Sequence, residues 1–579
     1  MKYRWIVKEV EKSIVENLKQ NLNLGAVFCT ILASRGVSDA KDAENFLQPK
    51  WQHLHNPYLF YEMKEAISRI KRAVQNQEKI FLYGDYDVDG VTSTSLLYQC
   101  LKLLKANVEY YIPDRLKEGY GMHISSIQYL HQKNANLIIT VDCGISSCKE
   151  VEEANRLGID VVVTDHHEVD EQIPKAFAIV NPKDPRGTYP FKGIAGVGVA
   201  FKVAWALCQE FSEDAQKVAP QLREFLLDSM ALVALGTISD VAPLVDENRI
   251  MARYGLLALE TTKSVGLKSL KSIANINQLK TITSEHVGFR LGPRINAMGR
   301  LENSFESVEL LTTNSVEKAE NLAKKMELQN QKRKTLQEKM YRQAKQHIER
   351  NHLAHKKVLT LAEESWHPGV VGIVANRLLE EYYRPVLMIA LNNGEGRGSA
   401  RSIPGFHLFQ ALQGGCRHLM AYGGHEMAAG FKIKKEEIPN LDNYLNQRAQ
   451  EILTQEQMQP ALTIDSEITL QDIDWDFINL VEKMTPFGEG NSEPLLLCKN
   501  LEIVKNPAPE RYGTKGEHLS FRVRSGEKIF RAIFFGEGQM FDSLMSSTHC
   551  DLVFKAKRNT WNDTEYIQLT IKDMHLFSK

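Results

Sequence analysis

The sequence lacks several features that would assign a protein to a class at once. Its eight cysteines are scattered and form no Cys-x-x-Cys pair, which argues against a zinc knuckle and a secreted disulfide framework. The N-terminal residues MKYRWIVKEV are charged and lack the apolar run of a signal peptide. No apolar run reaches the roughly 18 residues of a membrane-spanning helix. We therefore expect a cytoplasmic protein without a membrane partner.

The sequence also lacks an excess of basic residues. It has 71 Lys and Arg against 72 Asp and Glu, a net charge of −1, whereas nucleic-acid-binding proteins are usually more basic. Any basic surface must therefore be local and offset by acidic stretches such as 465–493. The length of 579 residues is too great for one hydrophobic core, so three or more domains are expected.

From about residue 64, near-continuous apolar runs alternate with helical segments, and residues 198–235 read as helices. This alternation predicts a parallel α/β sheet. The expected strands are 79–83, 108–112, 137–141, 159–163 and 177–180. We divide the chain into an N-terminal helical segment (1–60), a parallel-sheet domain (61–310), a long connecting helix (311–357), a second α/β domain (358–455) and an all-β barrel (456–579).

The stretch 315–357 contains no Gly or Pro and holds 12 Lys and Arg against 5 Glu. It is typical of one long helix, or of two with a small break. It fits either a solvated connector or a basic strut beside a nucleic-acid groove. Beyond it, the short alternating runs 518–524 and 529–535 are typical of a small antiparallel barrel.

Three carboxylates follow the first expected strand at alternate positions, as Asp85, Asp87 and Asp89. Buried together without a cation, they would repel each other strongly. The pattern resembles the start of a calcium loop. A strand precedes it, however, and the Glu at the twelfth loop position is absent, so calcium is disfavoured.

Further metal-binding side chains follow later elements. Asp142 ends the third expected strand, the Asp165-His166-His167 triplet ends the fourth, and Asp240 follows a helix. Taken singly, each of these residues could instead be a helix cap or a surface histidine. Together at one edge of a parallel sheet, they predict a metal site. Mixed Asp and His ligation suits Mn²⁺, and two ions would form a clamp for phosphoryl displacement.

The motifs DYDVDG, VDCG, DHH and SDVAPL resemble the DHH phosphoesterase superfamily. The segments GFRLGPRINAMGRL, SWHPGVVGIVANRL, RSIPGFHL and GGHEMAAGF resemble the RecJ family of single-strand-specific exonucleases. The resemblance runs from about residue 45 to the end. It implies degradation of single-stranded DNA from 5′ to 3′ into mononucleotides, in recombination, repair and mismatch repair. It also implies a monomer coupled to a RecQ-type helicase and to single-strand-binding protein.

The resemblance also implies roles for the clustered residues. Two Mn²⁺ or Mg²⁺ ions would be held by a ligand pool whose bridging aspartate the sequence leaves open. Asp165 would orient a neighbouring group, and His167 would either complete the site or donate to the scissile phosphate. The ligand pool is Asp85, Asp87, Asp89, Asp142, His166 and Asp240.

The second α/β domain resembles the DHHA1 module. Residues 396–402 offer backbone N–H groups, hydroxyls and two arginines, a composition suited to phosphate, although the glycines could simply make tight turns. We expect the 5′-terminal phosphate to be held by Ser399, Arg401 and Arg115. His425 would bind phosphate near the metals. The residues Arg294, Asn296 and Arg300 are either further strand contacts or a helix-terminal salt-bridge set.

The tail resembles an oligonucleotide-binding (OB) barrel. Residues 505–531 hold 7 Lys and Arg against 3 Glu, with Tyr512, Phe521 and Phe530 interleaved. Basic groups with stacking rings suit a single strand, although alternating aromatics also mark any half-buried strand. The alternative functions are a DHH-type phosphodiesterase for short oligonucleotides or cyclic dinucleotides, and a non-catalytic scaffold. The tail of about 120 residues and the complete ligand set argue against both.

Overall fold

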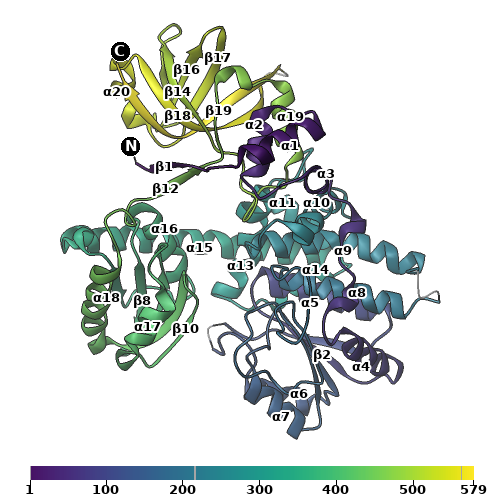
Figure 1. Cartoon of the computed structure of the whole chain (residues 1–579). Coiled ribbons are helices and arrows are strands. Elements are labelled where there is room, and N and C mark those ends of the chain that lie inside the picture. The colour runs from purple at the N-terminus through teal and green to yellow at the C-terminus, as the bar shows by residue number, and fades with distance from the viewer. Residues whose placement is uncertain (1, 116, 214–216, 562–563, 579) are drawn as a thin grey trace. The chain divides into compact units, whose positions relative to one another are not determined.

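The structure is a computed structural model that describes residues 2–115, 117–213, 217–561 and 564–578 (Figure 1). The chain forms two compact units. The larger contains Gln52–Met458 and Gly488–Gly490, and the smaller contains Met1–Trp51, Gln459–Phe487 and Asn491–Lys579. Within the described residues, no helix combines the length and apolarity needed to cross a bilayer. The expected class is confirmed: a multidomain α/β protein with a parallel sheet, a long helix, a second sheet domain and a β-rich C-terminal domain.

A parallel sheet with the strand order β3-β2-β4-β5-β6 forms the first part of the larger unit. Its strands coincide with the five predicted apolar runs. The chain passes from β2 to β3 on one side and then returns to β4 on the other, and sheets of this kind bind ligands at that switch point. The strands are β2 (Ile80–Tyr83), β3 (Val108–Tyr111), β4 (Leu137–Val141), β5 (Asp160–Thr164) and β6 (Ala178–Val180).

Helices cover both faces of this sheet. α6 (Ile124–Gln132) and α7 (Cys148–Arg156) share an apolar core with Phe81, Ile138 and other residues of alternate strand positions. On the opposite face lie α5 (Val88–Leu103) and α8 (Gly196–Glu210), which contact β2, β4 and each other (Figure 1). The sheet is therefore buried on both sides, as its continuous apolar strands require.

The remainder of the first domain is helical. The long helix α9 (Pro220–Ser239) packs against both α5 and α8 and so reaches the same edge of the sheet. The segment η3 (Val287–Leu291) is a turn of π-helix that leads directly into α13 (Gly292–Leu301). The other helices are α4 (Met63–Gln75), α10 (Asp246–Thr261), α11 (Val265–Ile273), α12 (Ser284–His286) and α14 (Phe305–Thr312).

The connecting stretch forms one helix, α15 (Val316–Arg350), of 35 residues, or about 52 Å at 1.5 Å per residue. It begins at Ser315, whose side chain accepts a hydrogen bond from the Lys318 N–H. The helix packs on α11, α13 and α14, and its C-terminal half shares a core with α16 (Val371–Tyr382) through Met340 and Ala344. It is therefore a packed element at both ends and not only a solvated connector.

The second α/β domain has a mixed sheet in the order β10-β11-β9-β8-β7, of which only β7 and β8 are parallel. The glycine-rich stretch 396–402 forms most of strand β9 and is not a set of tight turns. A Cβ at Gly398 would collide with the ring of Phe431 on the neighbouring strand. The elements are β7 (Leu359–Glu363), β8 (Val386–Asn392), β9 (Glu395–Arg401), β10 (Ala421–Gly424), β11 (Ala428–Lys434), α17 (Leu408–Gly414) and α18 (Ile438–Ile452).

The smaller unit contains a barrel. Its strands follow the order β13-β14-β18-β19-β17-β16-β15, and the additional pairing of β14 with β16 closes five of them into a ring. A closed five-stranded barrel is the architecture of the OB fold. The strands are β13 (Ser466–Glu467), β14 (Leu496–Val504), β15 (Glu510–Tyr512), β16 (His518–Ser525), β17 (Lys528–Phe534), β18 (His549–Trp561) and β19 (Thr564–Phe577).

The N-terminal segment belongs to the same unit as this barrel. It is mostly helical, as expected, but it also contains β1 (Arg4–Val7), which pairs in parallel with β12 (Ala461–Ile464). Leu18 and Phe28 lie in one apolar core with barrel residues such as Leu552. The helices are α1 (Lys12–Leu22), α2 (Ala26–Ala33), α3 (Ala40–Leu47), α19 (Trp475–Lys483) and α20 (Phe541–Ser546).

Candidate functional site

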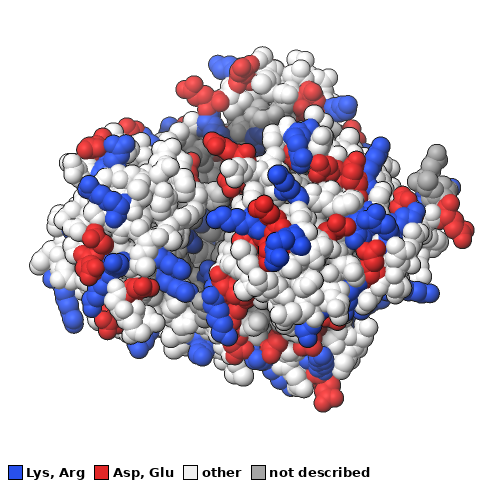
Figure 2. All heavy atoms as spheres, turned by 90° about the horizontal axis from the view of Figure 1, so that it is seen from below, with Lys and Arg blue, Asp and Glu red and all other residues white. Residues whose placement is uncertain are grey.

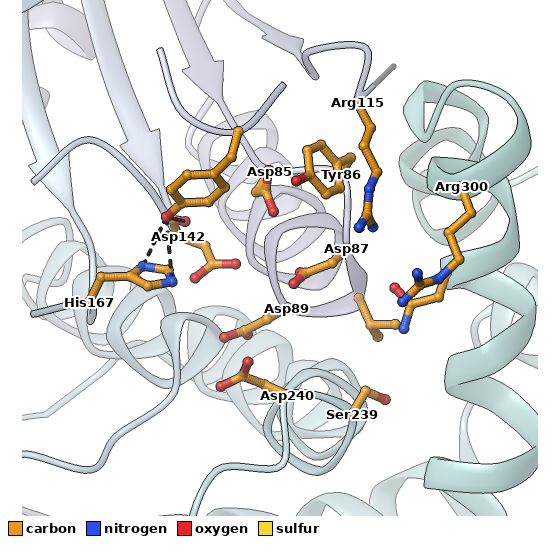
Figure 3. A pocket seen from close by; sticks show the side chains of 13 residues that line it. Asp85, Tyr86, Asp87, Asp89, Arg115, Asp142, His167, Ser239, Asp240 and Arg300 are labelled. Atoms are coloured by element: carbon orange, nitrogen blue, oxygen red, sulfur yellow. Dashed lines mark hydrogen bonds between the residues drawn. The ribbon is translucent and has the colours of Figure 1, made fainter. Parts of the chain in front are cut away.

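The acidic motif forms the turn between β2 and α5, at the switch point of the parallel sheet. Asp87 is the N-cap of α5 and accepts a hydrogen bond from the Gly90 N–H at 3.0 Å. A Cβ at Gly90 would lie 2.6 Å from the carbonyl oxygen of Asp85, so the turn requires glycine there. The tight turn brings the three carboxylates of this motif to the sheet edge (Figure 3).

Asp142 follows β4 on the other side of the switch point. Its φ of +62° lies in the left-handed region, which is uncommon for a residue other than glycine and often accompanies function. The alternative reading as a helix cap is wrong, because the N-cap of α7 is Ser147. The Asp142 carboxylate instead lines the cavity with the carboxylates of the acidic motif (Figure 3).

The N-terminus of α8 binds the side chain of Asp89, which lies in the first turn of α5. The carboxylate of Asp89 accepts hydrogen bonds from the N–H groups of Gly196 at 2.7 Å and Val197 at 2.8 Å. A Cβ at Gly196 would lie 2.7 Å from Asp142 Oδ1 and 2.9 Å from Asp89 Oδ2. Glycine at this position therefore allows the helix end to approach two acidic groups. The sequence does not predict this contact, and its one trace there is Gly196 itself.

The Asp-His-His triplet follows β5. Asp165 is fully buried and accepts hydrogen bonds from the Ile145 N–H at 3.0 Å and the His166 N–H at 2.7 Å. Its Oδ1 also lies 2.7 Å from His167 Nδ1. Burial opposes ionisation of Asp165, but these contacts hold its pKa below the usual range. Asp165 is therefore a charged group that orients His167.

The two histidines of the triplet differ in charge. Burial, together with the neighbouring imidazole of His167, lowers the pKa of His166 to about 3, so the ring is neutral. Its Nε2 lies 3.1 Å from Asp142 Oδ1 and 3.9 Å from Asp89 Oδ2. Burial also disfavours the cation at His167, but the hydrogen bond to Asp165 outweighs it and raises the pKa of His167 to about 9.

Ligand atoms from these elements form three overlapping groups. In each group the atoms lie within 4.8 Å of one another, and Asp240 joins from the C-terminal end of α9. Asp142 and His166 each occur in two groups, so the positions are adjacent. The groups are Asp85, Asp87 and Asp142; Asp89, His166 and Asp240; and Asp142, His166 and His167.

The protonation of the acidic groups shows that the site suits a cation. Burial, and then repulsion between neighbouring carboxylates, raises the pKa of Asp89 to about 7 and of Asp240 to about 9. The same causes raise the pKa of Asp85 and Asp142 well above the usual range. Within the described residues, the buried Oδ1 atoms of both Asp85 and Asp142 accept no hydrogen bond. Oxygen and neutral imidazole ligands of this kind fit Mn²⁺ or Mg²⁺.

A cavity of about 320 Å³ opens over these carboxylates. Figure 3 shows Asp87, Asp89, Asp142 and Asp240 facing one space, with Arg115 and Arg300 on its other side. The lining residues are Asp85, Tyr86, Asp87, Val88, Asp89, Arg115, Tyr120, Asp142, His167, Ser239, Asp240, Asn296 and Arg300.

Arginines gather at the far side of this cavity. Burial, and then the charges of Arg115, Arg333 and Arg401, lower the pKa of Arg300 to about 9. Burial and Arg115 also lower the pKa of Arg401, whose Nη1 donates to Ser399 Oγ at 3.1 Å. Cations that depress each other's pKa in this way suit an anion placed between them.

Four of the expected substrate-binding residues do not line the cavity, namely Arg294, Ser399, Arg401 and His425. Arg294 is only 8% exposed, and its Nε lies 2.6 Å from Glu327 Oε2 on α15, while its Nη atoms donate to the Arg290 and Ile273 carbonyl groups. For Arg294 the salt-bridge alternative is therefore the correct one. His425 lies in the exposed turn between β10 and β11, and it does not line the cavity.

Four residues that line the cavity were not predicted from the sequence, namely Tyr86, Val88, Tyr120 and Ser239. Tyr120 Oη lies 3.0 Å from His167 Nδ1 and 3.4 Å from its Nε2, and it donates to the Asp142 carbonyl at 3.3 Å. Ser239 lines the cavity directly before Asp240. Tyr120 belongs to no strand-end pattern, whereas Ser239 is the first residue of the SDVAPL motif and could have been inferred from it.

The aromatic residues of the barrel are not exposed in the way that the sequence predicts. Phe521 is 3% exposed and belongs to the core, and Phe530 packs against that core, so neither ring is free to stack with a base. The exposed ring is Phe535, which contacts His518 at a centroid distance of 5.2 Å. Tyr512 packs against His518 at 5.0 Å. The aromatic cluster is thus Tyr512, His518 and Phe535.

The fold and the site define a DHH-type phosphoesterase. The chain matches the DHH family N-terminal domain over residues 79–235, the DHHA1 domain over 355–451 and the RecJ OB domain over 464–573. The single-stranded-DNA-specific exonuclease RecJ of Bacillus subtilis is 38% identical over 577 residues, covering 99% of this chain and 71% of that protein. The Haemophilus influenzae protein of the same name is 34% identical, covering 93% and 94%.

The crystal structure of RecJ from Thermus thermophilus in complex with Mn²⁺ matches with a TM-score of 0.83 at 28% identity. The match covers 99% of this chain and 80% of that one. The chain therefore belongs to the RecJ family of single-stranded-DNA-specific exonucleases.

Proposed function

We propose that this protein is a metal-dependent exonuclease that removes mononucleotides from the 5′ end of single-stranded DNA. The observation that carries the proposal is a single cavity with buried carboxylates on one side and mutually repelling arginines on the other. A phosphodiester strand with bound metal satisfies both sides at once. Membership of the RecJ family supports the choice of single-stranded DNA.

The metal ligands in this proposal come from the three overlapping groups of ligand atoms. Asp85 and Asp87 would belong to one ion and Asp89, His166 and Asp240 to a second, with Asp142 between them. Mn²⁺ or Mg²⁺ would be accepted, as in the Thermus thermophilus relatives solved with each ion. When bound, such ions lower the pKa of attacking water and neutralise charge on the phosphate.

His167 has the proton-handling role in the proposal. Because Asp165 fixes the Nδ1 side of the ring, the imidazolium is held in one orientation with Tyr120 against it. A cation at the cavity wall would donate a hydrogen bond to a non-bridging oxygen of the scissile phosphate. Asp165 is then a positioning residue that keeps His167 charged and oriented.

Recognition of the 5′ end would fall to the arginines. Arg401 and Ser399 from β9 and Arg115 from the end of β3 would hold the terminal phosphate, with Arg300 beside them. Guanidinium groups bind phosphate oxygens in a bidentate manner, so several of them form a strong anion site. A site that requires a terminal phosphate next to the metal ions would set the 5′ to 3′ direction.

Outside the cavity, the strand would be captured by charge and stacking. Figure 2 shows Lys and Arg side chains interspersed with Asp and Glu on one face, so basic groups are available there to phosphates. On the barrel, the exposed ring of Phe535 and the basic residues of 505–531 fit a single strand. Action in cytoplasmic recombination, repair and mismatch repair, as a monomer with a RecQ-type helicase and single-strand-binding protein, is the family-based part of the proposal.

The proposal is tested by substrate competition. A long 5′-phosphorylated single strand, a blunt duplex of the same sequence and a linear dinucleotide are each incubated with the protein and Mn²⁺. We expect rapid release of mononucleotides from the single strand, little from the duplex, and none after chelation of the metal. Preference for the dinucleotide would contradict the proposal and favour a phosphodiesterase for short oligonucleotides.

A further inference from the structure

Phe289 is the most exposed large hydrophobic side chain in the described part of the chain, with 80% of its surface accessible to solvent. Single exposed apolar residues are common on proteins and need no special role. Phe289 differs from them because its backbone is anchored and because it stands on the helical segment that leads into the cavity.

The backbone that carries Phe289 is firmly anchored. The π-helical turn η3 buries Val287 and Leu291, and a capping box between Thr283 and His286 precedes it. π-helical turns of this kind often occur at functional sites. The ring is therefore held out from a fixed element and not from a loop tip.

The same helical segment reaches the cavity. At Gly292, the residue that follows η3, a Cβ would lie 2.6 Å from Ser239 Oγ, and Ser239 lines the cavity beside Asp240. Asn296 and Arg300, four and eight residues after Gly292, also line it. Residues at such spacing share one face of a helix.

Phe289 lies seven residues before Asn296, in the π-helical turn that leads directly into α13. Arg300, beside the arginines of the proposed 5′-phosphate site, lies at the opposite end of the row. A strand with its 5′ end at Arg300 would therefore pass Asn296 and leave the cavity near Phe289.

The surroundings of the ring suit a nucleic-acid strand. Arg290, the next residue in the chain, is exposed and can approach phosphates. Val241, which directly follows Asp240, is 64% exposed and has a φ of +60°. A bulky β-branched residue is strained in that conformation, and its exposed side chain adds apolar surface next to Asp240 of the cavity.

We propose that Phe289 stacks against a base of the substrate strand on the 3′ side of the scissile phosphate, and so holds the strand in register for each cleavage. This inference rests on the proposed function. Every base offers a π-face, so stacking on a phenyl ring is independent of sequence, as a nuclease without sequence preference requires.

The test compares Phe289→Ala, Phe289→Leu and Phe289→Trp on a short 5′-phosphorylated strand. We expect the Ala and Leu variants to raise KM roughly tenfold with kcat nearly unchanged, and the Trp variant to restore the original KM. Leu328→Ala is the matched control, because Leu328 is 64% exposed on α15. It should change neither constant, and all variants should keep the original melting temperature.

Strands that lack one base identify which nucleotide stacks on Phe289. In the unsubstituted protein, removing the base that stacks on Phe289 should raise KM by a similar factor. The same abasic strand should raise KM no further in Phe289→Ala, because the stacking contact is already lost. An unchanged KM in Phe289→Ala would overturn the inference, as would equal abasic effects in both proteins. Gain of activity on a blunt duplex at unchanged single-strand KM would identify the ring as a steric barrier instead. If the original protein releases no nucleotides from a single strand, the proposed function fails as well.

Discussion

One side of the cavity gathers carboxylates and the other gathers arginines, so each side brings like charges together. On the side of the parallel sheet, Asp89 and Asp240 retain protons because burial and mutual repulsion raise their pKa values to about 7 and about 9. On the side of β9 and α13, Arg300 has its pKa lowered to about 9 by burial and by other arginines. Each side destabilises its own charge in the free protein. Each side would therefore be stabilised by an ion of opposite charge, a cation for the carboxylates and an anion for the arginines.

The largest effect is expected when a carboxylate is removed from the acidic side of the cavity. Asp142→Ala removes the carboxylate that lies between the two ligand groups, and we expect nucleotide release to fall by about a thousandfold or more. The variant should also lose the rise in melting temperature that Mn²⁺ gives the original protein. Asp170→Asn, an exposed acid outside the cavity, serves as the control. An Asp142→Ala protein with normal activity would defeat the two-ion proposal.

A second substitution tests the acidic side without removing a ligand. Gly196→Ala places a Cβ within 3 Å of carboxylate oxygens of Asp89 and Asp142, so the start of α8 must withdraw. We expect an activity loss of about a hundredfold, with weakened Mn²⁺ binding measured by calorimetry. Gly25→Ala is the control, since a Cβ there meets no atom within 4 Å. Unchanged Mn²⁺ affinity in Gly196→Ala would show that the helix end does not position the ligands.

A third substitution tests the basic side. Arg401→Ala should raise KM about tenfold to a hundredfold for a 5′-phosphorylated strand, because a charged hydrogen bond to phosphate is lost. The same strand with a 5′ hydroxyl should be affected much less. Lys432→Ala, an exposed cation on the neighbouring strand β11, is the control. Equal effects on both ends would place the terminal phosphate elsewhere.

The smallest expected effect concerns pH. The metal-free folded protein keeps protons on Asp240 and His167 up to a pKa of about 9, whereas the unfolded chain releases them near 3.8 and 6.5. The folded state therefore binds more protons, and its stability must fall as pH rises from about 6.5 to 9. We expect the melting temperature of the larger unit to fall by about 1 °C for each kcal/mol lost, because the entropy of unfolding grows with chain length.

Saturating Mn²⁺ should remove most of this pH dependence, because bound metal replaces the protons on the carboxylates. Differential scanning fluorimetry with and without a chelator measures both curves, and Asp240→Asn should flatten the metal-free curve. A metal-free melting temperature that rises over this pH range would contradict the assigned protonation states.

The sequence predicts the acidic side better than the basic side. The strands of the parallel sheet are buried on both faces, so they appear as continuous apolar runs, and Asp85 and Asp142 follow directly where those runs end. The N-terminus of α8 reaches Asp89 only through tertiary packing, which no local pattern encodes. The same is true of Tyr120, which contacts His167 from a segment without regular structure.

On the basic side, residue type alone does not decide which side chains face the cavity. Arg294 and Arg300 lie in one motif, but only Arg300 faces the cavity, because six residues place them on different faces of α13. Phe521 and Phe535 also look alike in sequence. Strand alternation decides that Phe521 points into the barrel, and only the closed sheet reveals this.

The shared core of the N-terminal helices and the C-terminal barrel has a consequence for biosynthesis. Phe28 packs in the same core as Leu552, and β1 pairs with β12, which lies more than 450 residues later in the chain. A ribosome adds about 5–20 residues per second, so the first helices wait on the order of half a minute or longer for their partners. During that time the larger unit can fold, while the first 51 residues expose an apolar face. The emerging chain therefore exposes apolar surface that the finished protein buries.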